Sequence, residues 1–367
     1  MFLSNIQLLN FKNYEEAHMV CSPQINCLVG ENGSGKTNML DAIHYLSLVK
    51  SAFAGHDQQS IKHQSGFFSV MGSFDLEVRK HKVLCGLQAG AKKVLKCDQV
   101  AYDRLSDHIG RFPVVLMAPH DTDLIREGSE ERRRFFDTII CQLDQHYLQA
   151  LMNYSNLLKQ RNALLRQCQP VGRIDEDLLA TYDHALLQKG QAIAERRQVF
   201  VAYFEPLFQA HYRELSGGRE AVALNYRSEV LTEGFGDRFR SAVQKDLILG
   251  RTTLGVHRDD LKFSIDGHAV KRFGSQGQQK SFVIALKLAQ FDVLQEQKGF
   301  KPILLLDDIF DKLDDQRMHH LLSLVADGRF GQIFITDARP ERTKSLVAGM
   351  AQVKVFRVDQ GKISEEE

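Results

Sequence analysis

Residues 30 to 37 form a complete phosphate-binding loop with the sequence Gly-Glu-Asn-Gly-Ser-Gly-Lys-Thr. An apolar, strand-like run precedes the loop at 25–29, and apolar residues with helical spacing follow it at 39–46. Glycines in such a loop let backbone N–H groups surround phosphates, and the helix N-terminus adds favourable partial charge. The alternative is a glycine-rich turn followed by Lys-Thr by chance, and the flanking strand and helix argue against it.

The loop predicts a site for ATP and Mg²⁺. We expect Lys36 to reach the β- and γ-phosphates and to contribute to catalysis, and Thr37 to offer its hydroxyl to Mg²⁺. The predicted ATP-binding residues are Gly30, Glu31, Asn32, Gly33, Ser34, Gly35, Lys36, Thr37 and Asn38.

A second apolar strand, at 303–306, ends in two adjacent carboxylates, Asp307 and Asp308. Two neighbouring acids repel each other, and a Mg²⁺–nucleotide site would explain why they are tolerated. We expect Asp307 to hold the Mg²⁺ shell and Asp308 to act as general base toward the attacking water. An Asp-rich turn after a strand is the alternative, which the presence of Lys36 disfavours.

Composition is that of an ordinary globular protein of 367 residues, with 43% hydrophobic and 25% charged residues. The formal net charge is +1, so any nucleic-acid surface must be a local basic patch. The six cysteines form no C-x-x-C pair and are expected to be reduced thiols. The N-terminus lacks a cleavable leader and no apolar run approaches ~20 residues, so we expect a cytoplasmic protein.

The middle of the chain is helical in character. Apolar residues recur at helical spacing through 130–168 and again through 175–215, and a turn signal separates the two runs at 169–173. We expect two long helices that fold back as an antiparallel arm; two surface helices of one domain are the alternative. Mixed α/β structure precedes this region, and alternating strands and helices follow it.

A polar turn opens a helix shortly before the acidic strand. It contains Ser275, Gln276, Gly277 and Gln278, and it is similar in place and type to the signature motif of ABC-type ATPases. In those proteins the serine hydroxyl and backbone N–H groups bind the γ-phosphate held by the other subunit. Residues 215–219, with Ser216, match the usual signature letters better, but a strand-like run follows them and they lie far from Asp307. We therefore assign the signature to Ser275.

Two further segments fit the same class of ATPase. Leu313 and Asp314 fit the D-loop, which lies along the dimer seam in ABC ATPases. The strand at 332–337 ends in Thr336 and Asp337, where such proteins often carry a switch histidine. A γ-phosphate sensor is therefore either a threonine or missing.

Taken in order, these motifs resemble the SMC-like branch of the ABC ATPases, and most closely the RecF family of DNA repair proteins. The resemblance covers essentially the whole chain. It includes Leu-Asn-Phe-Lys-Asn-Tyr at 9–14, Ala-Pro-His-Asp-Thr-Asp-Leu-Ile at 118–125, Arg-Arg-Arg-Phe-Phe-Asp at 132–137 and Gly-Val-His-Arg-Asp-Asp-Leu at 255–261. The last segment is the most specific, because transporter ATPases have nothing like it.

The resemblance implies an α/β ABC-type ATPase head, a mixed sheet with flanking helices, into which an antiparallel helical arm is inserted. Residues 1–128 would form the N-terminal part of lobe I, 129–250 the arm and lobe II, and 251–367 the C-terminal ATPase part. It also implies ATP-dependent homodimers on double- and single-stranded DNA, work with RecR-type and RecO-type mediators in loading recombinase at gaps, and slow ATP hydrolysis.

Some positions depart from the family pattern. Residues 50–54, Lys-Ser-Ala-Phe-Ala, lack the arginine that relatives often carry there, and the Q-loop position near His120 is not glutamine. The basic clusters 132–134 and 196–197 are candidates for DNA contact, although charge runs on long helices are more often a solvated face.

Two other functions remain as alternatives. An ABC ATPase subunit of a membrane transporter would share the nucleotide motifs, but not the helical arm or the 255–261 segment. A small-molecule kinase would share the phosphate-binding loop, but it needs neither a signature nor a D-loop. DNA-stimulated ATPase activity without membranes would separate the first function from both alternatives.

Overall fold

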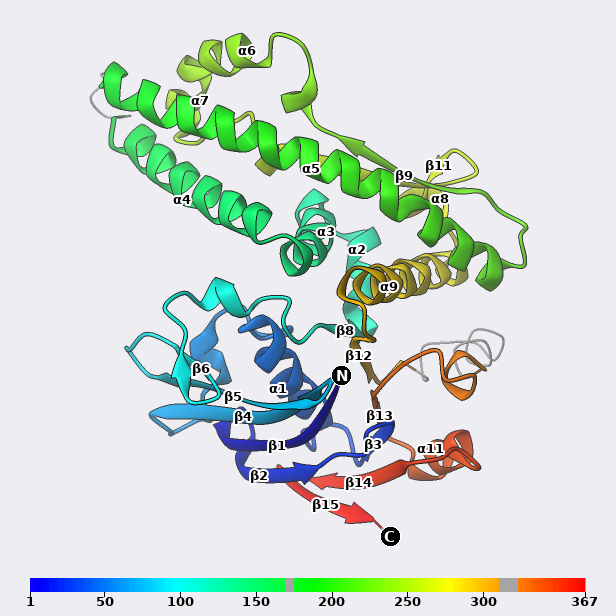
Figure 1. Ribbon diagram of the computed structural model, residues 1–367. Coiled ribbons are helices and arrows are strands. Elements are labelled where there is room, and N and C mark those ends of the chain that lie inside the picture. Colours follow the sequence, from blue (N-terminus) through cyan, green and yellow to red (C-terminus); the bar gives the residue numbers. More distant parts are fainter. Residues whose placement is uncertain (169–174, 310–322, 367) are drawn as a thin grey trace. The chain divides into compact units, whose positions relative to one another are not determined.

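The computed structural model describes residues 1–168, 175–309 and 323–366. The chain divides into two compact units (Figure 1). Unit 1 joins the two ends of the chain, Met1–Asp121 and Gln290–Glu367, and unit 2 is the intervening Thr122–Ala289. The mixed α/β fold with a pair of long helices agrees with the sequence-based expectation.

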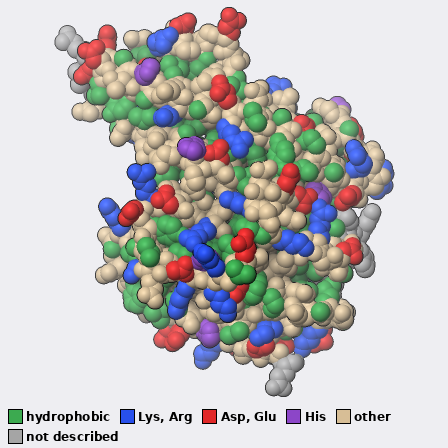
Figure 2. Space-filling model, in the orientation of Figure 1, with side chains coloured by type: hydrophobic (Ala, Val, Ile, Leu, Met, Phe, Trp, Pro, Cys, Tyr) green, Lys and Arg blue, Asp and Glu red, His purple; other side chains and the backbone are tan. Residues whose placement is uncertain are grey.

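Charged side chains of both signs are interspersed on the face shown in Figure 2. This distribution fits the net charge of +1. Among the described helices, none has both the length and the apolar character required to cross a membrane. All six cysteines are free thiols, as expected.

A six-stranded, mainly parallel sheet forms the centre of unit 1, with the order β15-β14-β3-β13-β12-β8. Its strands are β3 (Ile25–Val29), β8 (Val114–Met117), β12 (Ile303–Asp307), β13 (Ile333–Asp337), β14 (Val353–Asp359) and β15 (Lys362–Glu366). Every residue of β3, β12 and β13 is buried, as is usual for parallel strands covered on both faces. Because these three strands run parallel, their carboxyl ends meet at one edge of the sheet.

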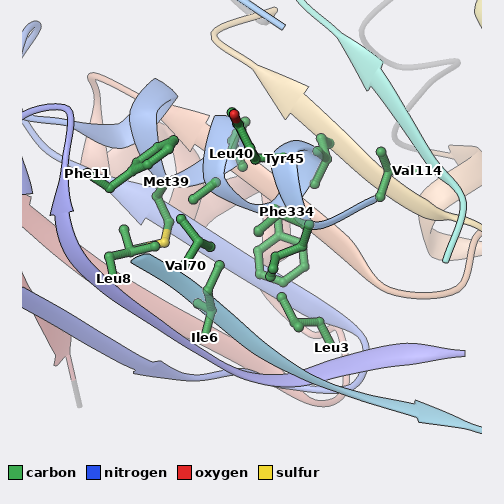
Figure 3. Packing of buried hydrophobic residues seen from close by; sticks show 14 of the residues in the cluster. Leu3, Ile6, Leu8, Phe11, Met39, Leu40, Tyr45, Val70, Val114 and Phe334 are labelled. Carbon is green, nitrogen blue, oxygen red and sulfur yellow. The ribbon is translucent and has the colours of Figure 1, made fainter. Parts of the chain in front are cut away.

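A second, antiparallel sheet of unit 1 has the order β2-β1-β4-β5-β6-β7. Its strands are β1 (Phe2–Phe11), β2 (Tyr14–Val20), β4 (Phe67–Leu76), β5 (Arg79–Gln88), β6 (Val94–Cys97) and β7 (Val100–Ala101). Helix α1 (Lys36–Leu48) contacts strands of both sheets. Figure 3 shows the resulting core, where side chains of α1 lie among those of the two sheets; the labelled residues are Leu3, Ile6, Leu8, Phe11, Met39, Leu40, Tyr45, Val70, Val114 and Phe334.

Unit 2 is built on helices α3 (Ser129–Leu143), α4 (Gln145–Cys168) and α5 (Glu176–Ser216) with a three-stranded sheet. The sheet has the order β11 (His268–Ala269), β10 (Asp260–Ile265), β9 (Val222–Arg227). Helices α4 and α5 lie side by side, and α5 also packs on β9 (Figure 1). The run at 130–168 is two helices rather than the one expected, because Asp144 is extended and its carboxylate accepts a hydrogen bond from Tyr147 N.

Shorter elements complete the chain. Five helices belong to this group together with five 3₁₀ turns among the described residues: α2 (Asp123–Arg126), α6 (Phe235–Ser241), α7 (Val243–Leu249), α8 (Val270–Phe273), α11 (Pro340–Val347), η1 (Asp57–Ser60), η2 (Leu105–His108), η3 (Pro119–Thr122), η4 (Glu229–Leu231) and η5 (Val256–Arg258). Helix α9 (Gln276–Lys298) is long and begins directly after the polar turn at Ser275.

Two buried arginines hold unit 2 together. Arg161 of α4, fully buried, pairs with Asp183 at 2.6 Å and with Asp246 at 2.7 Å. Arg197 of α5 pairs with Asp137 at 2.8 Å and Asp259 at 3.0 Å. Each guanidinium therefore links helices to segments distant in sequence, and losing one would leave buried carboxylates uncompensated.

Histidine 257 gives unit 2 a predicted pH dependence. Burial lowers the pKa of His257 to about 4, from 6.5, despite a hydrogen bond to Thr252 O. The unfolded chain takes up a proton near pH 6.5, so the free energy of unfolding should fall between there and about pH 4, by up to about 1.4 kcal/mol per pH unit. His257→Asn should reduce the difference between denaturant unfolding at about pH 7 and about pH 5. His268→Asn, which changes an exposed histidine, serves as the control. If His257→Asn keeps the wild-type difference in unfolding free energy between the two pH values, His257 is not the source of the pH dependence.

Candidate nucleotide site

The predicted phosphate-binding loop connects β3 to α1, at the carboxyl edge of the parallel sheet. Backbone geometry explains two of its glycines. Gly30 and Gly35 have φ of 156° and 122°, and a Cβ would come within 2.1 Å of Val358 O at the first and 2.6 Å of Asn13 Nδ2 at the second. Only glycine fits at these close approaches.

Lys36 is the first residue of α1 and is buried. Its Nζ donates hydrogen bonds to the carbonyl oxygens of Gly30 at 2.7 Å and Glu31 at 2.8 Å, so the ammonium lies across its own loop. Burial lowers the pKa of Lys36, and the carboxylates of Asp308 and Asp307 act in the opposite direction. A concentrated positive charge is therefore held inside the loop, facing acids from the neighbouring strand.

Thr37 and Asp307 meet across the site. The Thr37 hydroxyl donates to Asp307 Oδ1 at 2.8 Å, and the Thr336 hydroxyl donates to the same oxygen at 2.9 Å. Burial raises the pKa of Asp307, while these two hydroxyls oppose that rise. A hydroxyl and a carboxylate are the hard oxygen ligands that Mg²⁺ takes together with nucleotide phosphates, so Thr37 and Asp307 fit the ion.

Asp308 follows in a left-handed backbone conformation, with φ of 46°. Its N–H donates to Thr336 Oγ1 at 2.9 Å, which fixes the turn at the end of β12. Its Oδ1 atom is buried and accepts no hydrogen bond from the described residues. The residue lines a pocket together with Asn32, Gly33, Gly35, Lys36, Thr37, Asn38 and Thr336. An unpartnered carboxylate oxygen beside a phosphate-binding loop can accept a proton from water.

Asp337, at the end of β13, has a different environment. It is fully buried, and its carboxylate accepts hydrogen bonds from Arg342, from the Thr343 hydroxyl and from Arg339 N. The pKa of Asp337 lies below its ordinary value, because these bonds outweigh the opposing effect of burial. Its oxygens are occupied, and Thr336 is the residue of this pair that lines the pocket.

The two signature candidates, Ser275 and Ser216, lie at opposite ends of two different helices of unit 2, one at an N-terminus and the other at a C-terminus. Ser275 is exposed at the N-terminus of α9, where its Oγ accepts from Gln278 N at 3.2 Å and Gln278 Oε1 accepts from Ser275 N at 2.6 Å. Ser216 is the last residue of α5, and its Oγ is buried. A helix N-terminus attracts phosphate, whereas a C-terminus repels it. The geometry favours Ser275.

The remaining predicted positions are placed as follows. Leu313 and Asp314, the expected D-loop, lie outside the described residues. Within 50–54, Ser51 donates to Asp41 Oδ2 at 2.6 Å, and the Phe53 ring meets the His120 ring at a centroid distance of 5.2 Å. Lys12 pairs with the same Asp41 at 2.6 Å.

The basic clusters offered as DNA contacts are largely engaged within unit 2. Arg132 pairs with Asp260 at 2.8 Å, and Arg133 donates to Asp259 O at 2.6 Å. Arg197 is only 3% exposed and is neutralised by two carboxylates. The hypothesis that Arg197 contacts DNA is therefore wrong, since its charge is needed inside the unit.

One further group of metal-type ligands lies in unit 1. The ligand atoms of His81, Cys97 and Asp98 lie within 4.8 Å of one another. Asp98 already accepts from His81 Nδ1 at 2.7 Å and from Lys82 N at 2.8 Å, and Arg111 Nη2 lies 3.5 Å from His81 Nδ1. The nearby Arg111 guanidinium disfavours a bound cation. The hydrogen bonds that Asp98 accepts instead hold the turn between β6 and β7 against β5.

Comparison with known proteins agrees with the motifs. The model of the RecF/RecN/SMC N terminal domain matches residues 2–81. The DNA replication and repair protein RecF of Cytophaga hutchinsonii is 47% identical over 100% of this chain and 97% of its own length. The RecF of Flavobacterium johnsoniae is 45% identical over 98% of this chain and its own full length.

Solved structures give the same result for the fold. A structure of the recombination mediator protein RecF with ATP in the RecFOR pathway matches with a TM-score of 0.89 and 27% identity, covering 100% of this chain and 98% of that one. An Smc head domain from Pyrococcus furiosus matches at 0.55 and 16% identity, with coverage of 100% and 96%, and supports the head fold alone. These likenesses do not favour the transporter alternative. The chain belongs to the RecF family of DNA replication and repair proteins.

Proposed function

We propose that this protein is an ATP-dependent clamp of recombinational DNA repair and replication in the cytoplasm. Two copies would close on DNA with ATP, help to load recombinase at single-strand gaps, and reopen after slow hydrolysis to ADP and phosphate. The observation that carries the proposal is the convergence of Lys36, Thr37, Asp307 and Asp308 at one sheet edge. The solved RecF described with ATP supports the choice of nucleotide.

Each residue has a definite part in this proposal. The loop from Gly30 to Asn38 would bind the phosphates through backbone N–H groups, with Lys36 against the β- and γ-phosphates. Thr37 and Asp307 would hold Mg²⁺, which when bound neutralises phosphate charge. Asp308 would orient the attacking water and accept its proton through the unpartnered Oδ1.

Dimerisation would be the purpose of the exposed polar turn at Ser275. The N-terminus of α9 offers favourable partial charge, and the exposed Ser275 a hydroxyl, to a phosphate held by a second copy. In the proposed division, residues 1–128 and 251–367 supply the ATPase parts, and 129–250 the arm and second lobe. The RecFOR pathway named for the solved relative supports RecR-type and RecO-type proteins as partners.

Changing Lys36 tests the site directly. Lys36→Met should weaken ATP binding by ~10²-fold or more, because it removes a charge from the phosphates. Lys36→Arg should spare binding more than hydrolysis, since a guanidinium fork cannot place its charge identically. Titration of purified protein with ATP measures both effects. Equal ATP affinity in Lys36→Met and wild type would rule out the site.

Affinity for DNA should depend strongly on salt. Net charge is near zero, so local basic patches must bind the phosphate backbone and release counterions, with little dependence on sequence. ATP should strengthen binding, because a dimer joins two DNA-binding surfaces. Filter binding or anisotropy over a salt series, with and without a non-hydrolysable ATP analogue, measures this. A salt-independent affinity, or no response to the analogue, would contradict the clamp.

A further inference from the structure

The turn between β1 and β2 reaches the phosphate-binding loop from outside. Asn13, in that turn, donates from Nδ2 to the carbonyl oxygen of Ser34 at 2.9 Å. Its Oδ1 accepts from Asn38 Nδ2 at 2.8 Å. The Asn13 amide therefore hydrogen-bonds to two parts of the loop. One is the carbonyl of Ser34, two residues before Lys36, and the other is the side chain of Asn38, directly after Thr37.

Neighbouring groups complete this outer support. The Tyr14 hydroxyl, on a fully buried side chain, donates to the carbonyl oxygen of Gly35 at 3.0 Å. Gly361 N, in the hairpin between β14 and β15, donates to the Ser34 carbonyl at 2.9 Å. Two successive loop carbonyls are thus held by donors from two hairpins.

The turn that carries Asn13 is itself fixed. Lys62 Nζ donates to Asn13 O at 3.3 Å, and Lys12 pairs with Asp41 of α1 at 2.6 Å. A Cβ on Gly361 would come within 2.6 Å of Asn13 O, so the two hairpins are in close contact. The amide of Asn13 therefore has little room to move relative to the loop.

These contacts have a consequence for phosphate binding. In a trans peptide the carbonyl of one residue and the N–H of the next point in opposite directions. Holding the carbonyls of Ser34 and Gly35 outward turns the N–H groups of Gly35 and Lys36 to the other side of the loop. Gly35 and Lys36 both line the pocket.

We propose that Asn13 is a positioning residue that presets the phosphate-binding loop and thereby sets its affinity for nucleoside di- and triphosphates. The inference rests on the proposed function of this loop as the ATP site. An amide is required because one group must donate to Ser34 and accept from Asn38. Aspartate has the same size and still accepts from Asn38, but it places a carboxylate beside the Ser34 carbonyl.

The test compares Asn13→Ala, Asn13→Asp and wild type as full-length protein, by titration with Mg-ATP and Mg-ADP. We expect about 10-fold weaker binding for Asn13→Ala, which loses the hydrogen bond, and about 100-fold for Asn13→Asp, where repulsion is added. ATP and ADP should weaken by the same factor, because both carry the β-phosphate. Asn5→Ala, on the strand β1 that precedes this turn, should bind as wild type does.

Further readouts separate positioning from a loss of fold. The thermal midpoint without nucleotide should change by less than about 3 °C in Asn13→Ala. In ATP hydrolysis, the KM for ATP should rise in parallel with the dissociation constant. The kcat should change by less than about threefold, because Asp308 is untouched. A fall in affinity that follows a large fall in midpoint would overturn the inference.

Lys36→Met separates a failure of the Asn13 role from a failure of the proposed nucleotide site on which that role rests. If wild type does not bind ATP, or Lys36→Met binds it equally well, the proposed nucleotide site fails. If Lys36→Met loses binding while Asn13→Asp stays within about twofold of wild type, the nucleotide site stands and Asn13 has no positioning role.

Discussion

Replacing Asp308 with asparagine should slow ATP hydrolysis by ~10²–10⁴-fold and leave ATP binding intact. Asparagine keeps the shape of the side chain and tolerates the left-handed backbone found at this position. The hydrogen bond from the residue 308 N–H to Thr336 is also kept. What is lost is the negative charge on a buried oxygen that no described group satisfies, and with it the acceptor for the proton of water.

Single-turnover hydrolysis in the presence of DNA measures this effect, and size-exclusion chromatography with ATP gives a second readout. Dimers of Asp308→Asn should accumulate, because the step that reopens them is slow. Asp327→Asn, an exposed change in the same unit, is the matched control and should behave as wild type. Normal turnover in Asp308→Asn would place the general base elsewhere.

The parts of this site that the sequence predicted are those set by local pattern. The apolar run 303–306 gives β12, and the Gly-Lys-Thr motif after the largely apolar run 25–29 gives the turn into α1. The polar turn before α9 was predicted from its small polar residues and its glycine, and within it Ser275 and Gln278 form reciprocal hydrogen bonds that cap the helix. Each signal lies within a few residues of the structure it specifies.

The expectation of one helix through 130–168 failed for an equally local reason. Apolar residues keep helical spacing across Asp144, so periodicity alone predicts a continuous helix. The Asp144 carboxylate instead accepts from Tyr147 N and pairs with Arg196 at 3.0 Å. An aspartate that caps the next helix competes with continuation of the first one, and spacing does not report which of the two prevails.

Long-range partners outside the nucleotide motifs could not be predicted from the sequence. The Asn13 contact with Ser34 joins residues 21 apart, on a turn and a loop that no local pattern connects. Likewise, nothing within 196–197 distinguishes an exposed pair of arginines from one with a buried member. The partners of Arg197 are Asp137 and Asp259, on elements that only the folded chain brings together.

Replacing Ser275 with arginine should abolish ATP-dependent dimerisation while leaving ATP binding by the monomer nearly unchanged. Lys36 and Thr37 are untouched by this change, so the phosphate-binding loop keeps its function. A bulky cation would replace an exposed hydroxyl at the N-terminus of α9, where partial positive charge already repels it. Hydrolysis should fall with dimerisation. Analytical ultracentrifugation with and without ATP measures the association.

The control is the competing signature candidate, Ser216. Its Oγ is buried at a helix C-terminus, so Ser216→Arg is accompanied by the smaller Ser216→Ala and by a thermal midpoint for each. A folded Ser216 variant should dimerise with ATP as wild type does. If Ser216→Ala blocks dimerisation and Ser275→Arg does not, the assignment is reversed.

A mixture of Ser275→Arg and Lys36→Met proteins gives the sharpest form of this test. In a twofold dimer each composite site takes the loop of one subunit and the signature of the other. The mixed dimer therefore has one site that carries both defects and one site that is intact. Some ATP-dependent dimerisation should return in the mixture, although neither variant dimerises alone. If the mixture stays monomeric at concentrations where wild type associates, Ser275 does not act across the dimer, and the proposed pairing of loop and signature is wrong.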